Sequence, residues 1–204
     1  MLRKLAHIFS WVFQPLLMPT IAAALFLQLP FYTFKLMPIE LKWYVITCNA
    51  LFTILLPVLM IFLLLRNNMI ETLELKKLED RKYPIIFTIA FHIANYYFLS
   101  RAHLPGPYMF FLLAGLFSLI LTLIVTNYWK VSLHMTGIGG LIGGFLALSL
   151  IWPVDLRLVL FFMFLIAGIT GTSRLLLNVH TSAQVAVGFF VGFIPQLSLI
   201  LIAH

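Results

Sequence analysis

Long apolar runs alternate with short polar stretches along nearly the whole chain. Backbone groups inside a bilayer must pair within their own segment, so each apolar run predicts a helix. A run of about 20 apolar residues spans a hydrocarbon core of about 30 Å. The predicted segments are about 8–29, 43–65, 84–99, 108–128, 136–152, 158–173 and 184–203. The pattern therefore predicts an all-α, polytopic membrane bundle of six or seven transmembrane helices, with residues 1–204 in one domain.

The first segment departs from this regular pattern. Pro15 and Pro19 stand four residues apart, and a proline inside a helix breaks or kinks it. Segment 8–29 is therefore expected either to span with a kink or to be re-entrant or interfacial. Its basic start resembles a signal peptide, but the long, proline-interrupted run favours a retained segment.

Composition and charge restrict the class of protein. Hydrophobic residues make up 63% of the chain, charged residues 9%, and the mean hydropathy is +1.09, which excludes a soluble domain. The net charge of +7 is spread over loops without a basic tail. We therefore expect a lipid bilayer with anionic headgroups as partner and no nucleic acid.

Glycines recur at four-residue spacing in two of the late segments. The pairs are Gly139 and Gly143, Gly140 and Gly144, and Gly188 and Gly192. Small residues at this spacing let two helices approach closely in lipid. This pattern predicts tight helix packing.

Three polar islands interrupt the apolar pattern, at 66–83, 129–135 and 173–183. Two predicted crossings separate each island from the next, so all three should emerge on one membrane face whether or not the first segment spans. Their candidate functional residues are Lys76 and Arg81, then Ser132 and His134, then Ser173, Arg174, His180 and, just beyond the third island, Gln184.

These residue types suit a phosphate group at a lipid interface. Arginine forms paired, charge-assisted hydrogen bonds to phosphate and lysine adds a point charge. Two histidines can divide phosphoryl transfer, with one attacking phosphorus and the other protonating the leaving oxygen. No cluster has metal-ligand spacing, so we expect neither a metal nor a cofactor.

In these residues the chain resembles the type 2 phosphatidic acid phosphatase (PAP2) superfamily. The third superfamily signature, S-R-x5-H-x3-D, matches at Ser173, Arg174 and His180, with Gln184 at the position of the Asp. The second, P-S-G-H, keeps Ser132 and His134 within "VSLH". The resemblance covers residues 76–184.

The first signature, K-x6-R-P, matches only in part. It keeps Lys76 and Pro84 but has Tyr83 for the arginine, and Arg81 is a substitute two residues earlier. The dolichyl-diphosphate phosphatases of the superfamily also read H-T-x-x-Q, which is similar to "HTSAQ" here.

The resemblance implies roles for these residues. His180 is expected to form a phosphohistidine, His134 to protonate the leaving group, and Gln184 to orient His180. The residues expected to bind the substrate phosphate are Arg174, Lys76, Arg81, Ser132 and Ser173. The implied activity is a metal-independent phosphatase for a phosphorylated membrane lipid, either phosphatidate-like or a polyprenyl phosphate or diphosphate.

Two other functions stay open. Loss of the signature Asp and Arg is compatible with a catalytically silent relative that binds phospholipid headgroups or scaffolds a membrane complex. A small transporter has only the intramembrane His92 and Asn95 in its favour. We expect a bacterial inner membrane, and the distribution of Lys and Arg leaves open which face carries the islands.

Overall fold

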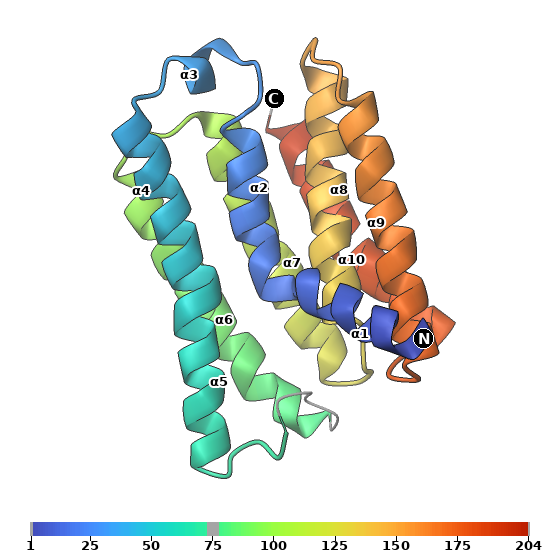
Figure 1. Ribbon diagram of the computed structural model, residues 1–204. Coiled ribbons are helices and arrows are strands. Elements are labelled where there is room, and N and C mark those ends of the chain that lie inside the picture. Colours follow the sequence, from blue (N-terminus) through green and yellow to red (C-terminus); the bar gives the residue numbers. More distant parts are fainter. Residues whose placement is uncertain (1, 73–77, 204) are drawn as a thin grey trace.

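The chain is described by a computed structural model that covers residues 2–72 and 78–203, without the side chains of residues 32 and 33. All regular structure in these residues is helical (Figure 1). The helices are α1 (Leu2–Val12), α2 (Met18–Phe26), α3 (Tyr32–Lys35), α4 (Ile39–Ala50), α5 (Leu56–Arg66), α6 (Lys82–Ser100), α7 (Gly106–Thr126), α8 (Leu133–Ile151), α9 (Arg157–Leu176) and α10 (Ser182–Ile202). Short 3-10 turns form at Pro15–Leu17 and Glu79–Arg81, and a π-helical turn, Leu51–Leu55, joins α4 to α5.

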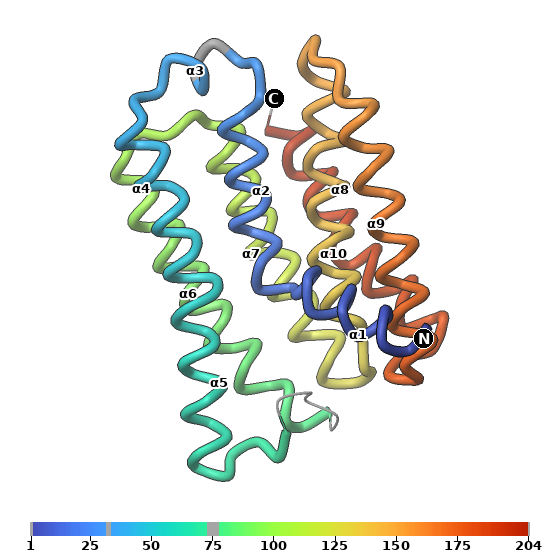
Figure 2. Tube along the Cα trace, viewed as in Figure 1, coloured from blue at the N-terminus to red at the C-terminus, as the bar shows by residue number. Residues whose placement is uncertain are grey.

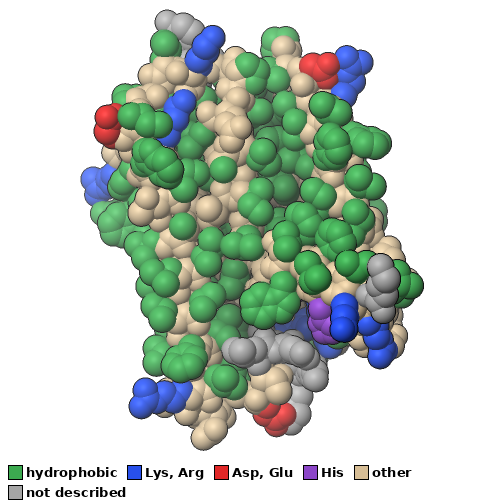
Figure 3. Space-filling view, viewed as in Figure 1, with side chains coloured by type: hydrophobic (Ala, Val, Ile, Leu, Met, Phe, Trp, Pro, Cys, Tyr) green, Lys and Arg blue, Asp and Glu red, His purple; other side chains and the backbone are tan. Residues whose placement is uncertain are grey.

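Six helical stretches of the described chain are long and apolar enough to cross a membrane. They are Leu2–Phe26, Ile39–Arg66, Gly106–Thr126, Leu133–Ile151, Arg157–Leu176 and Ser182–Ile202. The 19-residue α6 is less apolar, but it packs between α5 and α7 in the same bundle. The predicted all-α membrane bundle is confirmed. Apolar side chains cover the middle of the face in Figure 3, and charged side chains lie towards its two ends.

The first segment is divided at its prolines. Pro15 opens the 3-10 turn and Pro19 lies in the first turn of α2, where the missing N–H is tolerated. In Figure 1, α1 lies across the lower end of the bundle, whereas α2 runs along it. Segment 8–29 is therefore not one straight helix, because the chain turns before α2 begins.

The polar islands meet at one end of the bundle. In Figures 1 and 2, α5, α7 and α9 finish where α6, α8 and α10 begin. The connections after α5, α7 and α9 therefore lie together, as the count of crossings predicted. Residues 73–77, which include the predicted phosphate ligand Lys76, are outside the described residues.

Glycines bring α8 and α10 into close contact in the core. A Cβ atom on Gly188 would stand 2.7 Å from the carbonyl oxygen of Ser132, and one on Gly192 would stand 2.7 Å from the backbone nitrogen of Gly140. Neither position has room for a side chain, so the predicted tight packing is present. It fixes how the start of α8 sits against the first turns of α10.

Some helix ends differ from the predicted segments. The predicted segment 43–65 begins at Ile39, because Glu40 and Lys42 are polar but still helical. Similarly, α6 begins at Lys82, two residues before its apolar run. Hydropathy locates the membrane-embedded part of a helix, and the helix itself continues into the interface.

Candidate active site

The turn between α9 and α10 sets the distance between Arg174 and His180. Asn178 has a φ of 53°, the left-handed conformation that often ends a helix. The N–H of Val179 donates to the carbonyl of Arg174 at 3.3 Å, and that of Asn178 donates to Leu175 at 2.9 Å. This pair of bonds is a Schellman motif, which reverses the chain within three residues. The motif places Arg174 and His180 on either side of one tight turn.

The next residues form an N-terminal capping box. The Thr181 hydroxyl accepts from the Gln184 N–H at 3.3 Å, and Gln184 Oε1 accepts from the Thr181 N–H at 3.2 Å. Two otherwise unpaired backbone donors at the start of α10 are satisfied in this way. Because a backbone N–H donates to Oε1, the orientation of the Gln184 amide is determined.

Gln184 in turn determines which nitrogen of His180 carries the hydrogen. The Nδ1 atom of His180 lies 3.1 Å from the same Gln184 Oε1. An amide oxygen only accepts hydrogen bonds, so Nδ1 carries the hydrogen and the lone pair is on Nε2. Burial and, to a smaller extent, the cations Arg81, Arg174 and Lys130 together lower the pKa of His180 to about 4, against the opposing effect of its hydrogen bond to Gln184. At neutral pH the imidazole is therefore uncharged.

In His134 the hydrogen and the lone pair are on the opposite nitrogens from those in His180. It occupies the first turn of α8, and its Nε2 lies 3.0 Å from the backbone carbonyl of Ser10 in α1. A carbonyl only accepts, so Nε2 donates and Nδ1 has the lone pair in the neutral ring. A residue 124 positions away in the sequence thus sets the tautomer of His134.

Arg81 is buried at the start of α6, with 4% of its surface exposed. Its Nη1 donates to the carbonyl of Val131 at 2.8 Å, which joins the first polar island to the second. Burial, followed by the nearby Arg174, lowers the pKa of Arg81 to about 10, so the guanidinium is still charged at pH 7. Tyr83, at the signature arginine position, is 45% exposed.

One cavity of about 840 Å³ connects these residues. Arg81, His134, Arg174 and His180 all line it, and so does Lys130, which is not among the site residues predicted from the sequence. Lys130 had no signal of its own, because a lysine before a helix is usually only a solvated charge. The described lining contains no carboxylate. This end of the cavity is therefore cationic.

Four predicted site residues are not among the described residues that line the cavity. Ser132 is fully buried, and its N–H donates to the carbonyl of Gln184 at 3.2 Å, which joins α8 to α10. The Ser173 hydroxyl donates to Ile169 within α9 at 2.8 Å. Gln184 lies behind His180, and Lys76 falls outside the described residues.

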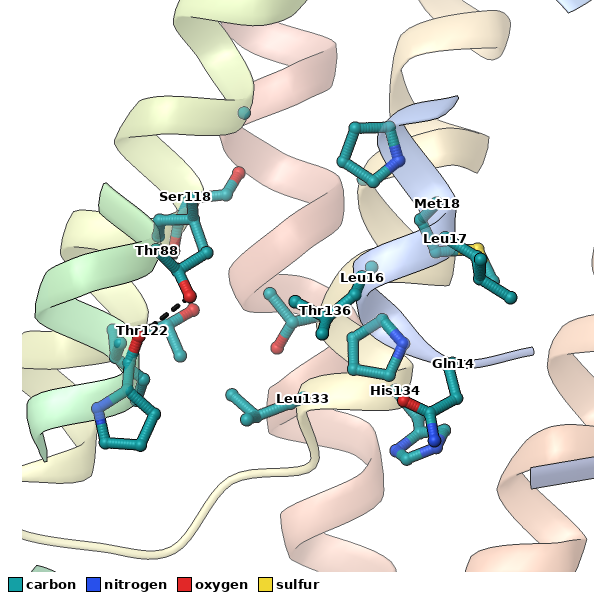
Figure 4. A pocket seen from close by; sticks show the side chains of 18 of the residues that line it. Gln14, Leu16, Leu17, Met18, Thr88, Ser118, Thr122, Leu133, His134 and Thr136 are labelled. Carbon is teal, nitrogen blue, oxygen red and sulfur yellow. Dashed lines mark hydrogen bonds between the residues drawn. The ribbon is translucent and has the colours of Figure 1, made fainter. Parts of the chain in front are cut away.

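The rest of the cavity is mostly apolar and extends into the bundle. Both Arg81 and His92 line it, and their separation along the chain corresponds to about 16 Å of helix. Figure 4 shows His134 near one end, with Thr88, Thr122 and Thr136 further in on three different helices. Their hydroxyls donate to carbonyls one turn back, at 2.6 to 3.2 Å. The cavity thus combines a charged entrance with a long interior suited to a hydrocarbon chain.

Three helices begin at the charged end of the cavity. Arg81 is the residue before α6, His134 lies in the first turn of α8, and His180 precedes the cap of α10. Unpaired N–H groups and the helix dipole make a helix N-terminus attractive to anions. These dipoles add to the three cationic side chains, so the field at this end favours a negatively charged group.

Among residues 2–72 and 78–203, no group of three His, Cys, Asp or Glu side chains could hold a metal ion. No family model, curated protein or solved structure matches the chain. The resemblance to a phosphatase superfamily therefore rests on the residues themselves.

Proposed function

We propose that this protein hydrolyses the phosphate or diphosphate ester of a membrane lipid, with His180 as nucleophile. The observation that carries the proposal is the cavity with two imidazoles and three cations at one end and an apolar interior beyond them. In residue type and order, this set resembles the signatures of the type 2 phosphatidic acid phosphatase superfamily. We expect the membrane to be a bacterial inner membrane.

Phosphate recognition is assigned to Arg81, Lys130 and Arg174. Arginine offers several N–H donors in one plane to phosphate oxygens, and lysine offers a compact charge. Both arginines keep part of their surface at the cavity wall. Charge that develops on the non-bridging oxygens during transfer is stabilised by cations already in place.

The chemistry is assigned to the two histidines. The Nε2 lone pair of His180 attacks the terminal phosphorus, and the bond from that phosphorus to the leaving oxygen breaks with its electron pair on that oxygen. The leaving oxygen is the lipid oxygen of a monophosphate or the bridging oxygen of a diphosphate. His134, in its protonated form, donates a proton to the departing oxygen. Water then attacks the phosphorus of the phosphohistidine while His134 takes a proton from that water. The bond between phosphorus and Nε2 breaks with its electron pair on Nε2, and phosphate leaves. The neutral state of His180 at pH 7 suits a nucleophile, because a protonated ring has no lone pair to donate.

The apolar interior supports a lipid as the substrate. A small soluble phosphate would use only the charged entrance, whereas about 16 Å of mainly apolar wall fits an acyl or prenyl chain. Acyl and prenyl chains bury apolar surface in the same way. Both phosphatidate-like lipids and polyprenyl phosphates or diphosphates are therefore candidate substrates.

A catalytically silent lipid-binding protein is the second candidate. The observation in its favour is Gln184, which orients His180 but supplies no negative charge to stabilise the imidazolium. Such a protein would use the same cations to hold a phosphorylated headgroup without cleaving it.

A release assay separates the two candidates. Purified protein would be incubated with phosphatidic acid, phosphatidylglycerol phosphate, undecaprenyl phosphate and undecaprenyl diphosphate, with and without EDTA. The proposal predicts phosphate release from at least one lipid at a rate that EDTA leaves unchanged. Binding of these lipids without release, by protein that melts cooperatively, would favour the silent alternative.

A matched pair of variants tests the role of His180. In His180→Asn, the amide nitrogen can replace Nδ1 and keep the bond to Gln184, but no nucleophilic nitrogen replaces Nε2. His103 is exposed, lies in the α6–α7 connection at the opposite end of the bundle, and has a φ of 52°, which asparagine tolerates. His103→Asn is therefore the control, with wild-type release expected.

A further inference from the structure

Helix α1 lies at the entrance of the cavity and not within the bundle. It packs against α9, and Figure 1 shows it across the lower end of the molecule. An extended residue, Gln14, and the 3-10 turn separate it from α2. Its orientation is therefore not dictated by a continuous transmembrane helix.

The exposed surface of α1 has two chemically different sides. At 100° per residue, positions 5, 8 and 12 fall on one side and positions 3, 4 and 7 on another. The exposed residues are Leu5, Ile8 and Val12 on the apolar side, and Arg3, Lys4 and His7 on the basic side, which also includes the exposed Trp11. A helix with an apolar side and a basic side lies in the plane of the membrane interface. The apolar side reaches the hydrocarbon while the basic side faces the headgroups.

The buried side of α1 contacts the site directly. Ser10 is only 6% exposed, and its carbonyl accepts the hydrogen bond from His134 Nε2. His7 and Trp11, exposed residues of the adjoining basic side, line the same cavity. Any movement of α1 away from the bundle would remove the partner that fixes the His134 ring.

We propose that α1 is a docking surface for anionic lipid headgroups, and that its docking holds His134 in position through the Ser10 carbonyl. The choice of anionic lipid follows from charge, because α1 contains Arg3 and Lys4 and no acidic residue. A lysine or arginine near an anionic leaflet is attracted strongly enough to change binding about fivefold. The effect on His134 rests on the proposed function, whereas the docking of α1 does not.

Hydrogen exchange in nanodiscs tests the docking itself. Discs of phosphatidylcholine alone would be compared with discs that contain about 30 mol% phosphatidylglycerol, a common anionic lipid. The expected result is at least fivefold slower exchange of the α1 amides in the anionic discs. In the double variant Arg3→Gln/Lys4→Gln this difference should disappear.

The control variant is Lys35→Gln/Lys42→Gln. These two lysines lie on α3 and α4 at the other end of the bundle, so the same charge is removed without touching α1. The α1 amides of this variant should respond to phosphatidylglycerol as in the wild type. Equal exchange of the wild-type α1 in both kinds of disc would overturn the docking proposal.

Turnover in the same discs tests the link to His134. Arg3→Gln/Lys4→Gln should slow release from a phosphate monoester in anionic discs by about fivefold or more, and slow release from a diphosphate less, because a diphosphate leaving group needs the proton less. If the variant leaves turnover unchanged but alters hydrogen exchange of the α1 amides, the proposed effect on His134 is wrong and the proposed docking of α1 is supported. If no disc supports turnover, the proposed function fails, and the exchange result still decides the docking.

Discussion

The Nδ1 atom of His180 and the Oε1 atom of Gln184 lie 3.1 Å apart, and the same oxygen caps the backbone of Thr181 at 3.2 Å. Gln184 therefore has two tasks: it begins α10 and it directs the His180 lone pair to Nε2. A side chain with both tasks connects the stability of the helix to the chemistry of the ring.

Replacing Gln184 with glutamate should keep the cap and change the charge. Glutamate also completes a capping box, and a negative charge is favourable at a helix N-terminus. A carboxylate within hydrogen-bond distance of an imidazole favours the protonated ring, typically by about 1 to 3 pKa units. NMR titration of labelled histidine should show a higher pKa for His180 in Gln184→Glu. An unchanged His180 titration in this variant would contradict the assigned hydrogen bond.

Gln184→Ala removes the capping side chain and adds no charge. Loss of a capping side chain costs about 1 kcal/mol, so this variant should melt at a lower temperature than Gln184→Glu. Release should also fall, because nothing then fixes the His180 tautomer. A melting temperature equal to wild type would show that the capping box contributes nothing to stability.

The low pKa of His180 predicts a pH-dependent stability. An unfolded histidine gains a proton near pH 6.5, whereas the folded His180 gains it only near pH 4. Between these values the unfolded state binds more protons, so lowering the pH favours unfolding. The melting temperature should therefore fall from pH 6.5 towards pH 4, and fall less in His180→Asn. Parallel pH curves for the two proteins would contradict the buried, neutral state of His180.

The close packing of α8 on α10 should be disrupted by any side chain added at Gly188. A Cβ there would meet the Ser132 carbonyl oxygen at 2.7 Å, so Gly188→Ala must push the start of α8 away from α10. Overpacking of this kind costs about 1 to 3 kcal/mol, and here it also displaces His134, two residues after Ser132. We expect both a lower melting temperature and slower release.

Gly168→Ala is the matched control for Gly188→Ala. Gly168 lies in the middle of α9, and a Cβ there would meet no atom within 4 Å. This substitution should leave release unchanged and keep or raise the melting temperature, because alanine favours the helix. Equal melting temperatures and equal release rates for the two variants would contradict the difference in packing around the two glycines.

Much of the fold follows from hydropathy alone. Apolar runs of sufficient length located the helices, and the number of crossings placed the three polar islands at one end. Pro15 and Pro19 predicted the break in the first segment, since proline cannot continue a helix without loss of a hydrogen bond. These features depend on local composition, so they can be predicted without knowing which helices touch.

Contacts between distant backbone atoms could not be predicted in the same way. The Ser10 carbonyl that holds His134, and the Val131 carbonyl that holds Arg81, are main-chain groups that every residue has. Nothing in the residue type marks them as partners. Lys130 was likewise indistinguishable from an ordinary interfacial lysine, and only the folded structure brings it to the same cavity as Arg81 and Arg174.

The role of His180 as nucleophile is tested best by trapping the phosphoryl group on the protein. Protein turning over a ³²P-labelled lipid phosphate would be quenched and mapped by mass spectrometry for a phosphate that is labile in acid and stable in base. We predict a phosphoryl group on His180, none in His180→Asn, and release by that variant reduced by at least about 10³-fold. A phosphorylated residue other than His180, or wild-type release by His180→Asn, would contradict this role.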